Sequence, residues 1–222
     1  LGAFRTEEES TQLCFVEKQG IRFGFLSYTY GLNGYQLPSD KLWKISMIDE
    51  AKIKADLEAI RPECDYLIVS MHWGNEYQQQ PNTEQRNLAQ WLLEQGVDHI
   101  IGSHPHVVQP IELVPSAEHP THHAIVYSLG NYVSNMSITH GDVGLAVELT
   151  LEKIAGTTRL KAIKHSLVYT ERAALSRRGD FRIIPADTLP TDLTSEARQR
   201  MQQAIATEEQ FLGKYNKIGP FK

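Results

Sequence analysis

Two short apolar runs flank an amphipathic segment in the middle of the chain, and this alternation constrains the fold more than any other feature. The runs are DYLIVSM at 65–71 and VDHIIG at 97–102. Each run is continuous rather than alternating, which is typical of a strand covered on both faces. The segment at 82–95 has the apolar periodicity of a helix, and Gly96 suits the left-handed position just after its end. The order strand, helix, strand predicts two neighbouring parallel strands in an α/β fold.

Further elements are predicted on both sides of this unit. The stretch IRFGFLSY alternates apolar and polar residues, as in a half-buried strand that follows a turn at Gln19–Gly20. Ser46 and Asp49 have the spacing of a capping box, so a helix is expected from there to about Arg61. The C-terminal half contains strand-like segments followed by a polar helix at 194–212.

Composition argues against two classes of partner. The 222 residues carry a formal net charge of −5, and no run of Lys and Arg forms a basic stripe, which argues against binding nucleic acid. No run of about 18 apolar residues is present, so no membrane span is expected. The N-terminal LGAFRTEEES lacks the basic and apolar regions of a signal peptide. Cys14 and Cys64 are expected to be buried thiols rather than a disulfide.

Three histidines lie just beyond the carboxyl ends of the two predicted parallel strands. His72 follows YLIVSM, and His104 and His106 follow HIIG. Parallel neighbouring strands end at the same edge of a sheet, where open α/β sheets bind ligands. Residues two apart in an extended segment point to the same side, so His104 and His106 can face one point. Imidazole nitrogens bind Zn, Mn and Fe, so the arrangement predicts a divalent metal site; each histidine taken singly could instead be a hydrogen-bonded surface residue.

Other polar residues have alternative roles. Glu76 is the only acid near His72, and it could be a partner of a metal ligand, a substrate contact or a plain loop residue. His140 follows a loop and could reach the same edge. No aspartate follows these strands to bridge two cations, because Asp65 and Asp98 begin their strands and lie at the opposite edge. The remaining histidines are expected to be exposed, at His119, His122 and His123, or structural, at His99 and His165.

The motifs around these histidines resemble a known family. MHWGNEY at 71–77 is followed by GVDHIIGSHPHVVQPIE at 96–112 and YSLGNY at 127–132. In this order they resemble the bacterial capsule-synthesis and poly-γ-glutamate-synthesis family of CapA type, which is similar to a branch of the calcineurin-like metallophosphoesterases. The resemblance covers roughly residues 10–150. It implies a layered α/β/β/α sandwich of metallophosphoesterase type.

The resemblance also implies roles for individual residues. His72, His104 and His106 would be ligands of one or two divalent cations (Mn, Zn or Fe), and His72 and His104 would also take part in catalysis. Asn131 would lie near the same edge, and with Glu76 and His140 it makes the set of candidate substrate contacts. The implied activity is metal-dependent hydrolysis of a phosphoester or related bond. The alternative is a non-catalytic, polymer-binding subunit of an envelope polymer synthesis or export complex.

The acidic motifs and the Asn-Asn-His motif that come earlier in that family have no counterpart here. The resemblance therefore implies that residues 1–185 form the C-terminal portion of the metallophosphoesterase-like domain, with 186–222 as a helical extension packed on it. We expect a companion segment or chain to supply the N-terminal part of the fold, to contribute further metal ligands and to cover an apolar sheet face. The family also implies an extracytoplasmic location in the bacterial cell envelope and an anionic polymer or phosphoester substrate.

Overall fold

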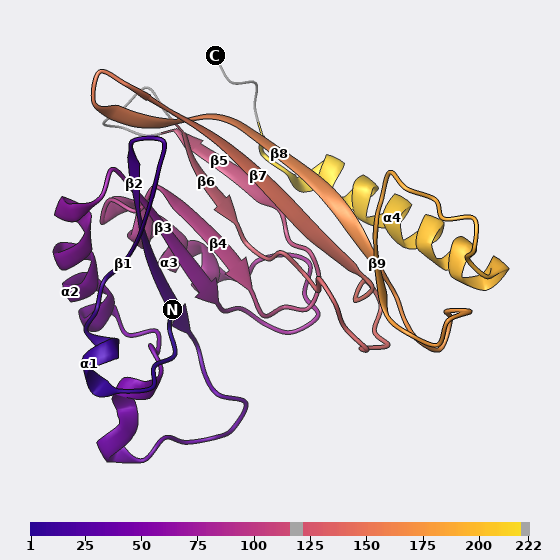
Figure 1. The fold of residues 1–222 in the computed structure, drawn as a ribbon, viewed down its shortest axis with the longest axis horizontal. Helices are drawn as coiled ribbons and strands as arrows, with labels where there is room; N and C mark the ends of the chain where they lie inside the picture. Colours follow the sequence, from indigo (N-terminus) through magenta and orange to yellow (C-terminus); the bar gives the residue numbers. More distant parts are fainter. Residues whose placement is uncertain (116–121, 219–222) are drawn as a thin grey trace.

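The computed structural model describes residues 1–115 and 122–218, which form two β-sheets and the helices that cover them (Figure 1). The larger sheet has six strands in the order β1-β2-β3-β4-β6-β5, and the smaller has three in the order β7-β8-β9. The strands are β1 Cys14–Lys18, β2 Ile21–Thr29, β3 Tyr66–His72, β4 His99–Ser103, β5 Ile111–Pro115, β6 His122–Val126, β7 Val143–Ile154, β8 Thr157–Glu171 and β9 Arg182–Pro185. The helices are α1 Glu7–Ser10, α2 Glu50–Ile60, α3 Thr83–Glu94 and α4 Ser195–Tyr215, with 3-10 turns at η1 Ser39–Lys44 and η2 Arg61–Glu63.

The centre of the six-stranded sheet is parallel. β2, β3, β4 and β6 run in the same direction, while β1 and β5 are antiparallel edge strands. The register pairs Thr29 of β2 with His72 of β3, and His72 with Ser103 of β4. The carboxyl ends of three adjacent strands therefore lie level with one another, and the predicted parallel pair is confirmed.

Helices α2 and α3 cover one face of this sheet and share a core with it. Helix α3 begins with a capping box, in which the side chains of Asn82 and Gln85 each accept from the other residue's backbone N–H. Helix α2 begins differently from the expectation. Its N-cap is Asp49, which accepts from the backbone N–H of Lys52 at 2.8 Å, and Ser46 takes no part in the cap. Ser46 instead pairs through its backbone with β2 and the N-terminal segment, which holds it in an extended conformation.

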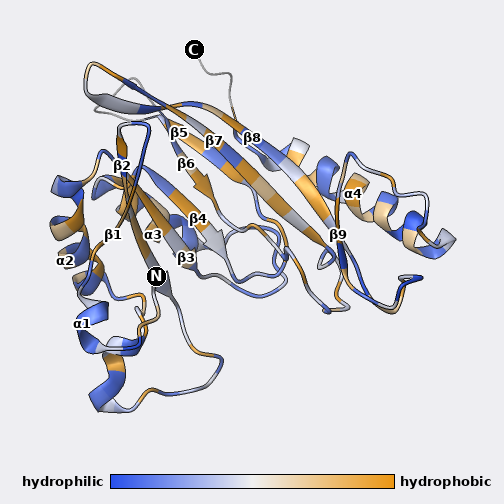
Figure 2. Ribbon diagram, viewed as in Figure 1, coloured by the Kyte–Doolittle hydropathy of each residue, from blue (hydrophilic) through white to orange (hydrophobic). Residues whose placement is uncertain are grey.

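On the opposite face of the six-stranded sheet, the β4–β6 side shares a core with the smaller sheet and α4. Side chains alternate along β6, so Ile125 packs with α2 and α3 whereas Ala124 and Val126 pack in the second core. β7 and β8 form a long hairpin whose apolar residues alternate with polar ones and share this second core with α4 (Figure 2). Helix α4 lies against β8, at the far end of the molecule from α2 (Figure 1). The layered α/β fold expected from the sequence is confirmed.

The segment before YSLGNY differs from the expectation. β5 has no counterpart among the predicted elements, and β6 begins at His122, so His122 and His123 lie in a strand instead of an exposed loop. The antiparallel partner explains the difference, because β5 pairs Pro115 with His122 and Val114 with His123. His119 lies outside the described residues.

His99 is fully buried between the two cores and has a structural role. The backbone N–H of Ala124 donates to its Nδ1 at 2.9 Å, so the proton of the neutral ring is on Nε2, which lies 2.7 Å from the Tyr66 hydroxyl. Burial lowers the pKa of His99 to about 3, because a charged ring at this position would have no water to solvate it. The neutral ring of His99 in β4 therefore links β3 and β6 through its two hydrogen bonds.

Two general expectations can also be compared with the structure. Cys14 and Cys64 are unpaired thiols, as expected, but both are half-buried rather than buried. Within residues 1–115 and 122–218, no helix combines the length and the apolar character needed to cross a membrane.

Candidate metal centre

The three histidines singled out by the sequence lie together at the carboxyl edge of the parallel strands. His72 is the last residue of β3, and His104 and His106 follow β4 directly. The ring centroids of His72 and His104 are 4.6 Å apart, and those of His104 and His106 are 6.0 Å apart. Two strand ends held in register by the sheet thus bring together three imidazoles from segments about 30 residues apart.

Glu76 joins two of these histidines in a cluster with metal-ligand geometry. One ligand atom from each of Glu76, His104 and His106 lies within 4.8 Å of the others, and no other such group of three occurs among the described residues. His72 is not a member of this group, although its ring packs against His104. The chemistry of the donors fits a divalent cation, since imidazole nitrogen and carboxylate oxygen both bind Zn, Mn and Fe.

Backbone strain is concentrated at this edge. His104 has φ +102°, His106 has φ +61° and Tyr77 has φ +66°, values that L-residues rarely adopt. Such conformations cost about 1–3 kcal/mol each and persist where surrounding structure enforces them, often at functional sites. His140, another candidate, has φ +65°. The positive φ values also show that the segment bearing His104 and His106 is not extended, contrary to the expectation from the sequence.

Neighbouring side chains fix the tautomers of two histidines. The Asn131 amide nitrogen donates to the carbonyl of Gly141 at 3.0 Å, which turns its Oδ1 toward Nδ1 of His106, also at 3.0 Å. Because Oδ1 can only accept, His106 carries its proton on Nδ1 and leaves the lone pair of Nε2 free. Thr29 does the same for His72: its hydroxyl donates to the Gly31 carbonyl at 3.0 Å and so accepts from His72 Nδ1 at 2.9 Å.

Burial disfavours the charged form of His72 and His104. Desolvation lowers the pKa of His72, and the nearby His106 lowers it further. Desolvation also lowers the pKa of His104, with a second contribution from His72. Neutral imidazole is the metal-binding form, so the lowered pKa values of His72 and His104 favour the form that binds a cation.

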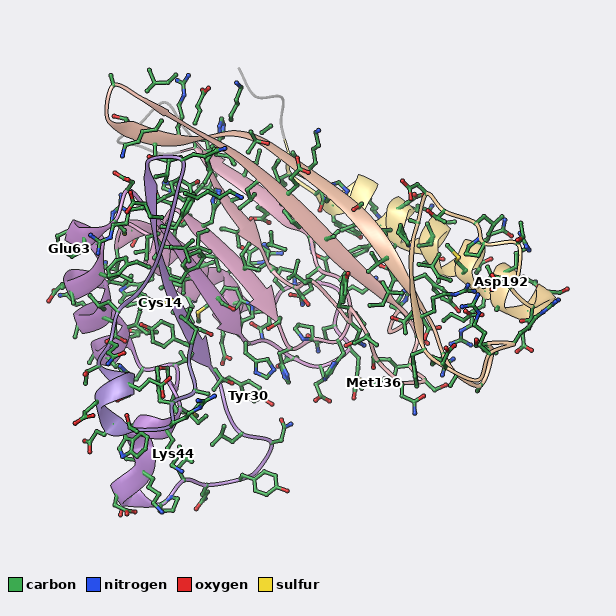
Figure 3. All side chains as sticks on the ribbon, in the orientation of Figure 1. Cys14, Tyr30, Lys44, Glu63, Met136 and Asp192 are labelled. Carbon is green, nitrogen blue, oxygen red and sulfur yellow. The ribbon has the colours of Figure 1, made fainter. Side chains whose placement is uncertain are left out.

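Two tyrosines that the sequence motifs did not single out for this edge flank the histidines. The ring of Tyr30 lies 4.3 Å from that of His104 and 5.6 Å from that of His72, and Figure 3 shows it next to the strand ends. The ring of Tyr77 stacks 6.1 Å from His106. Tyr30 directly follows β2, the strand beside β3, so the same strand-end logic applied to β2 would have found it.

His140 lies in a separate cluster that reaches this edge through hydrogen bonds. Its Nδ1 is 2.5 Å from Oε1 of Glu208, a residue of α4 that is only 1% exposed. The other oxygen of Glu208 accepts from the side chain of Gln79 at 2.8 Å, three residues beyond Glu76. A cavity of about 270 Å³ beside this pair is lined also by Arg200. Glu208 had a sequence signal, because it falls in the apolar stripe of α4 formed by Ala197, Met201, Ile205 and Leu212.

Asn131 should matter to metal binding even though it is not in the ligand group. Replacing it with alanine removes the partner of His106 Nδ1, so Zn²⁺ affinity measured by isothermal titration calorimetry is expected to fall about 10–100-fold. Asn131→Asp keeps the acceptor for His106 Nδ1 but loses the hydrogen bond to the Gly141 carbonyl, so it is expected to lose less affinity than Asn131→Ala. Equal affinity in Asn131→Ala and the unaltered protein would contradict this role.

Comparison with known proteins identifies the family. Residues 1–136 match the family described as bacterial capsule synthesis protein PGA_cap. The chain belongs to this family. The chain is 36% identical over 149 residues to the PGA biosynthesis protein CapA of Bacillus subtilis (strain 168), covering 67% of this chain and 34% of that protein. It is 28% identical over 143 residues to the capsule biosynthesis protein CapA of Bacillus anthracis, covering 63% and 33%. The chain thus spans about a third of the length of these relatives.

Solved structures show weaker likeness. A hypothetical protein from Thermus thermophilus has a TM-score of 0.45 at 17% identity, covering 70% of this chain and 60% of that one. The calcineurin-like phosphoesterase YfkN from Bacillus subtilis has a TM-score of 0.40 at 18% identity, covering 92% and 59%. Membership of the PGA_cap family therefore rests on the sequence comparisons, and the likeness to metallophosphoesterases remains an expectation from the motifs.

Proposed function

We propose that this chain carries the histidine-rich part of the centre of a metal-dependent hydrolase that acts in the synthesis of an anionic capsule polymer. The observation that carries the proposal is the group of Glu76, His104 and His106, whose ligand atoms lie within 4.8 Å at the sheet edge. The names of the two CapA relatives support the process, capsule or poly-γ-glutamate synthesis. The class of bond, a phosphoester or a related one, comes from the resemblance of the motifs to metallophosphoesterases.

The residues of this chain have distinct tasks in such a centre. His104 and His106 would hold the cation, and Asn131 orients His106. His72 keeps a neutral Nε2 beside the cluster, with which it can bind a second cation or accept a proton. A divalent cation supplies Lewis acidity and lowers the pKa of bound water. The ring of Tyr30 is 45% exposed and lies beside His104, where it would restrict the direction from which a substrate reaches the histidines.

The test is hydrolysis by the full-length gene product. With Mn²⁺ present, we expect it to cleave a chromogenic phosphomonoester or phosphodiester, and the double variant His104→Ala/His106→Ala to lose at least about 1,000-fold in rate. A protein that binds metal stoichiometrically but hydrolyses neither substrate, nor isolated capsule precursor, would contradict the hydrolase.

That last outcome would favour the second candidate, a polymer-binding accessory subunit of an envelope synthesis or export complex. The ligand group in the described part of the chain contains a single carboxylate, Glu76, so the carboxylates that bridge two cations in a two-cation hydrolase would have to come from elsewhere. Asp65 and Asp98 cannot bridge cations at this edge, because they pair with Lys153 and Arg61 at the opposite end of the strands.

A companion segment or chain is the partner that we propose. On the face of β1–β3 that points away from α2, Phe23, Phe25 and Ile68 are only half-buried, and Val16 is 51% exposed. Covering these side chains would bury apolar surface worth about 25 cal/mol per Å². We expect the 222-residue chain alone to self-associate in gel filtration. A soluble, monomeric and cooperatively unfolding chain would count against a companion.

The CapA relatives also lead us to propose an extracytoplasmic site of action in the cell envelope.

A further inference from the structure

We infer that the cavity between the loop at 138–142 and helix α4 binds one anionic group of the substrate, a carboxylate or a phosphate, with Arg200 as its charged donor. The inference deepens the proposed function and rests on it for the anionic polymer. The residues involved lie beyond 1–136, the stretch that matches the family, and they do not include the candidate metal ligands.

The loops at the carboxyl edge of the parallel strands provide no cationic side chain for an anionic polymer. Residues 30–40, 73–82, 104–110 and 127–142, which follow β2, β3, β4 and β6, contain no lysine or arginine. Carboxylates and phosphates are bound by Arg and Lys, and by Arg where a planar, bidentate contact is made. Apart from a bound cation, the groups that attract the polymer to this edge therefore have to come from other elements.

Two arginines from other elements meet at one carboxylate beside the cavity. Nε of Arg200 in α4 donates to Oδ2 of Asp142 at 2.5 Å. Nε of Arg172, directly after β8, lies 3.5 Å from Oδ1 of the same carboxylate. Asp142 is buried, so it interacts with both arginines with little screening by water. Two positive charges against one negative charge leave a surplus positive charge at this cluster.

Other acids near this cluster do not cancel the surplus. Oε2 of Glu171 accepts from Nε of Arg182 at 2.9 Å, and Oε1 of Glu208 lies 2.5 Å from Nδ1 of His140. Glu196, in the first turn of α4, is exposed, so water and salt screen its charge. These acids therefore leave the surplus positive charge of the two arginines in place, and an anion is the complementary ligand.

Buried polar groups at the same cluster have unused hydrogen-bonding capacity. Nε of Arg172 and the hydroxyl of Tyr169 are buried and make no hydrogen bond within the described residues. Tyr169 is paired in β8 with Val143, the residue after Asp142, and burial together with the charge of Asp142 raises the pKa of Tyr169 to about 12. Buried polar groups in native proteins nearly always have a partner, so this cluster is suited to a polar ligand.

The cavity has the size and lining of a subsite for one small group. Its volume is about 270 Å³, whereas pockets for a whole drug-sized ligand measure about 300–1,000 Å³. Ile138 and Ala204 contribute apolar surface, and His140 and Arg200 contribute polar groups. Arg200 uses Nε for Asp142, and its side chain is 39% exposed, so the N–H groups at the end of the guanidinium are available to an anion.

Two hydrogen bonds connect the wall of this cavity with the histidines. The side-chain amide of Asn131 donates to the carbonyl of Gly141, and its oxygen accepts from Nδ1 of His106, both at 3.0 Å. Gly141 directly precedes Asp142. An extended polymer can therefore hold one anionic group in the cavity while a bond further along the same polymer reaches the histidines.

The test is fluorescence anisotropy of fluorescein-labelled tetraglutamate titrated with the full-length gene product, with and without Mn²⁺. Arg200→Gln is expected to weaken binding at least about 10-fold in both conditions, because a hydrogen bond from a charged donor is lost. Lys214→Gln removes the same charge from an exposed position of α4 and is expected to change little. Competition with glutarate and with inorganic phosphate then shows which anion the cavity prefers.

A second pair of variants tests the cavity without altering an ion pair. Ala204→Leu fills part of the cavity and is also expected to weaken binding at least about 10-fold. Ala206→Leu adds the same bulk at an exposed position of the same helix and is expected to bind like the unaltered protein. Urea unfolding of each variant verifies that it is folded at the temperature of the titration.

Unchanged affinity in either Arg200→Gln or Ala204→Leu would overturn the inference, and metal-dependent hydrolysis by the same protein would still support the proposed function. Equal losses in Arg200→Gln and Lys214→Gln would also overturn it, because the effect would then come from overall charge. Absence of binding by the unaltered protein, with and without Mn²⁺, would contradict both the inference and the anionic polymer of the proposed function.

Discussion

Gly102→Ala is expected to destabilise the protein by about 3 kcal/mol, one of the largest effects available from a single methyl group. Gly102 lies in β4, two residues before His104, and a Cβ at this position would be 2.0 Å from the carbonyl oxygen of Tyr127 and 2.6 Å from Nε1 of Trp73. Neither neighbour can yield, because Trp73 Nε1 donates to that same carbonyl at 2.9 Å and both residues are buried. The backbone must therefore move, and it would carry the histidine segment with it.

Chemical unfolding in urea at pH 7.5 measures this effect, and Gly213→Ala is the matched control. Gly213 lies in α4 with no atom within 4 Å of an added Cβ and no positive φ. Alanine there is expected to stabilise the helix by about 0.5–1 kcal/mol. Gly102→Ala with an unchanged free energy of unfolding would show that the approach of β4 to Tyr127 is looser than described.

His140→Ala is expected to cost about 3 kcal/mol at pH 8, because Oε1 of the buried Glu208 carboxylate loses its partner and the carboxylate keeps only the hydrogen bond from Gln79. Burial already raises the pKa of Glu208, and the hydrogen bond from His140 opposes that rise. Without His140 the folded-state pKa of Glu208 rises further above its unfolded value. The folded variant then binds a proton that the unfolded chain does not hold, so its deficit shrinks as the pH falls through that raised pKa.

Unfolding of the variant at pH 8 and at pH 5.5 would show this trend, with the smaller deficit at the lower pH. The double variant His140→Ala/Glu208→Gln removes the charge and is expected to recover a large part of the loss at pH 8. The same change at the exposed neighbour, Glu209→Gln, should have little effect in either background. A deficit that is equal at both pH values would mean that Glu208 is not the source of the cost.

The strand ends were predictable from the sequence because the signals are local. DYLIVSM and VDHIIG are short and continuously apolar, and a helix of the right length separates them. These facts place the residues after each run at one sheet edge, so His72, His104 and His106 could be expected to meet. The observed register, with His72 beside Ser103, brings about that meeting.

Contacts between segments far apart in the sequence could not be predicted from such local patterns. Gln79 and Glu208 are 129 residues apart, and His140 and Glu208 are 68 apart, so no periodicity connects them. Glu76 had an open role because the direction of its side chain depends on the anchoring of its loop by buried Gln109. The position of Ser46 shows the reverse case, in which tertiary pairing with β2 overrides a local capping signal.

The measurement that tests the account most directly is bound metal per chain, by elemental analysis of protein purified without chelator. Both this chain and the full-length gene product would be analysed, each beside its His104→Ala/His106→Ala variant. The account predicts close to one Zn, Mn or Fe ion per chain in the unaltered protein and almost none in the variant. Metal-free protein in every sample, after Mn²⁺ and Zn²⁺ have been offered in excess, would contradict it.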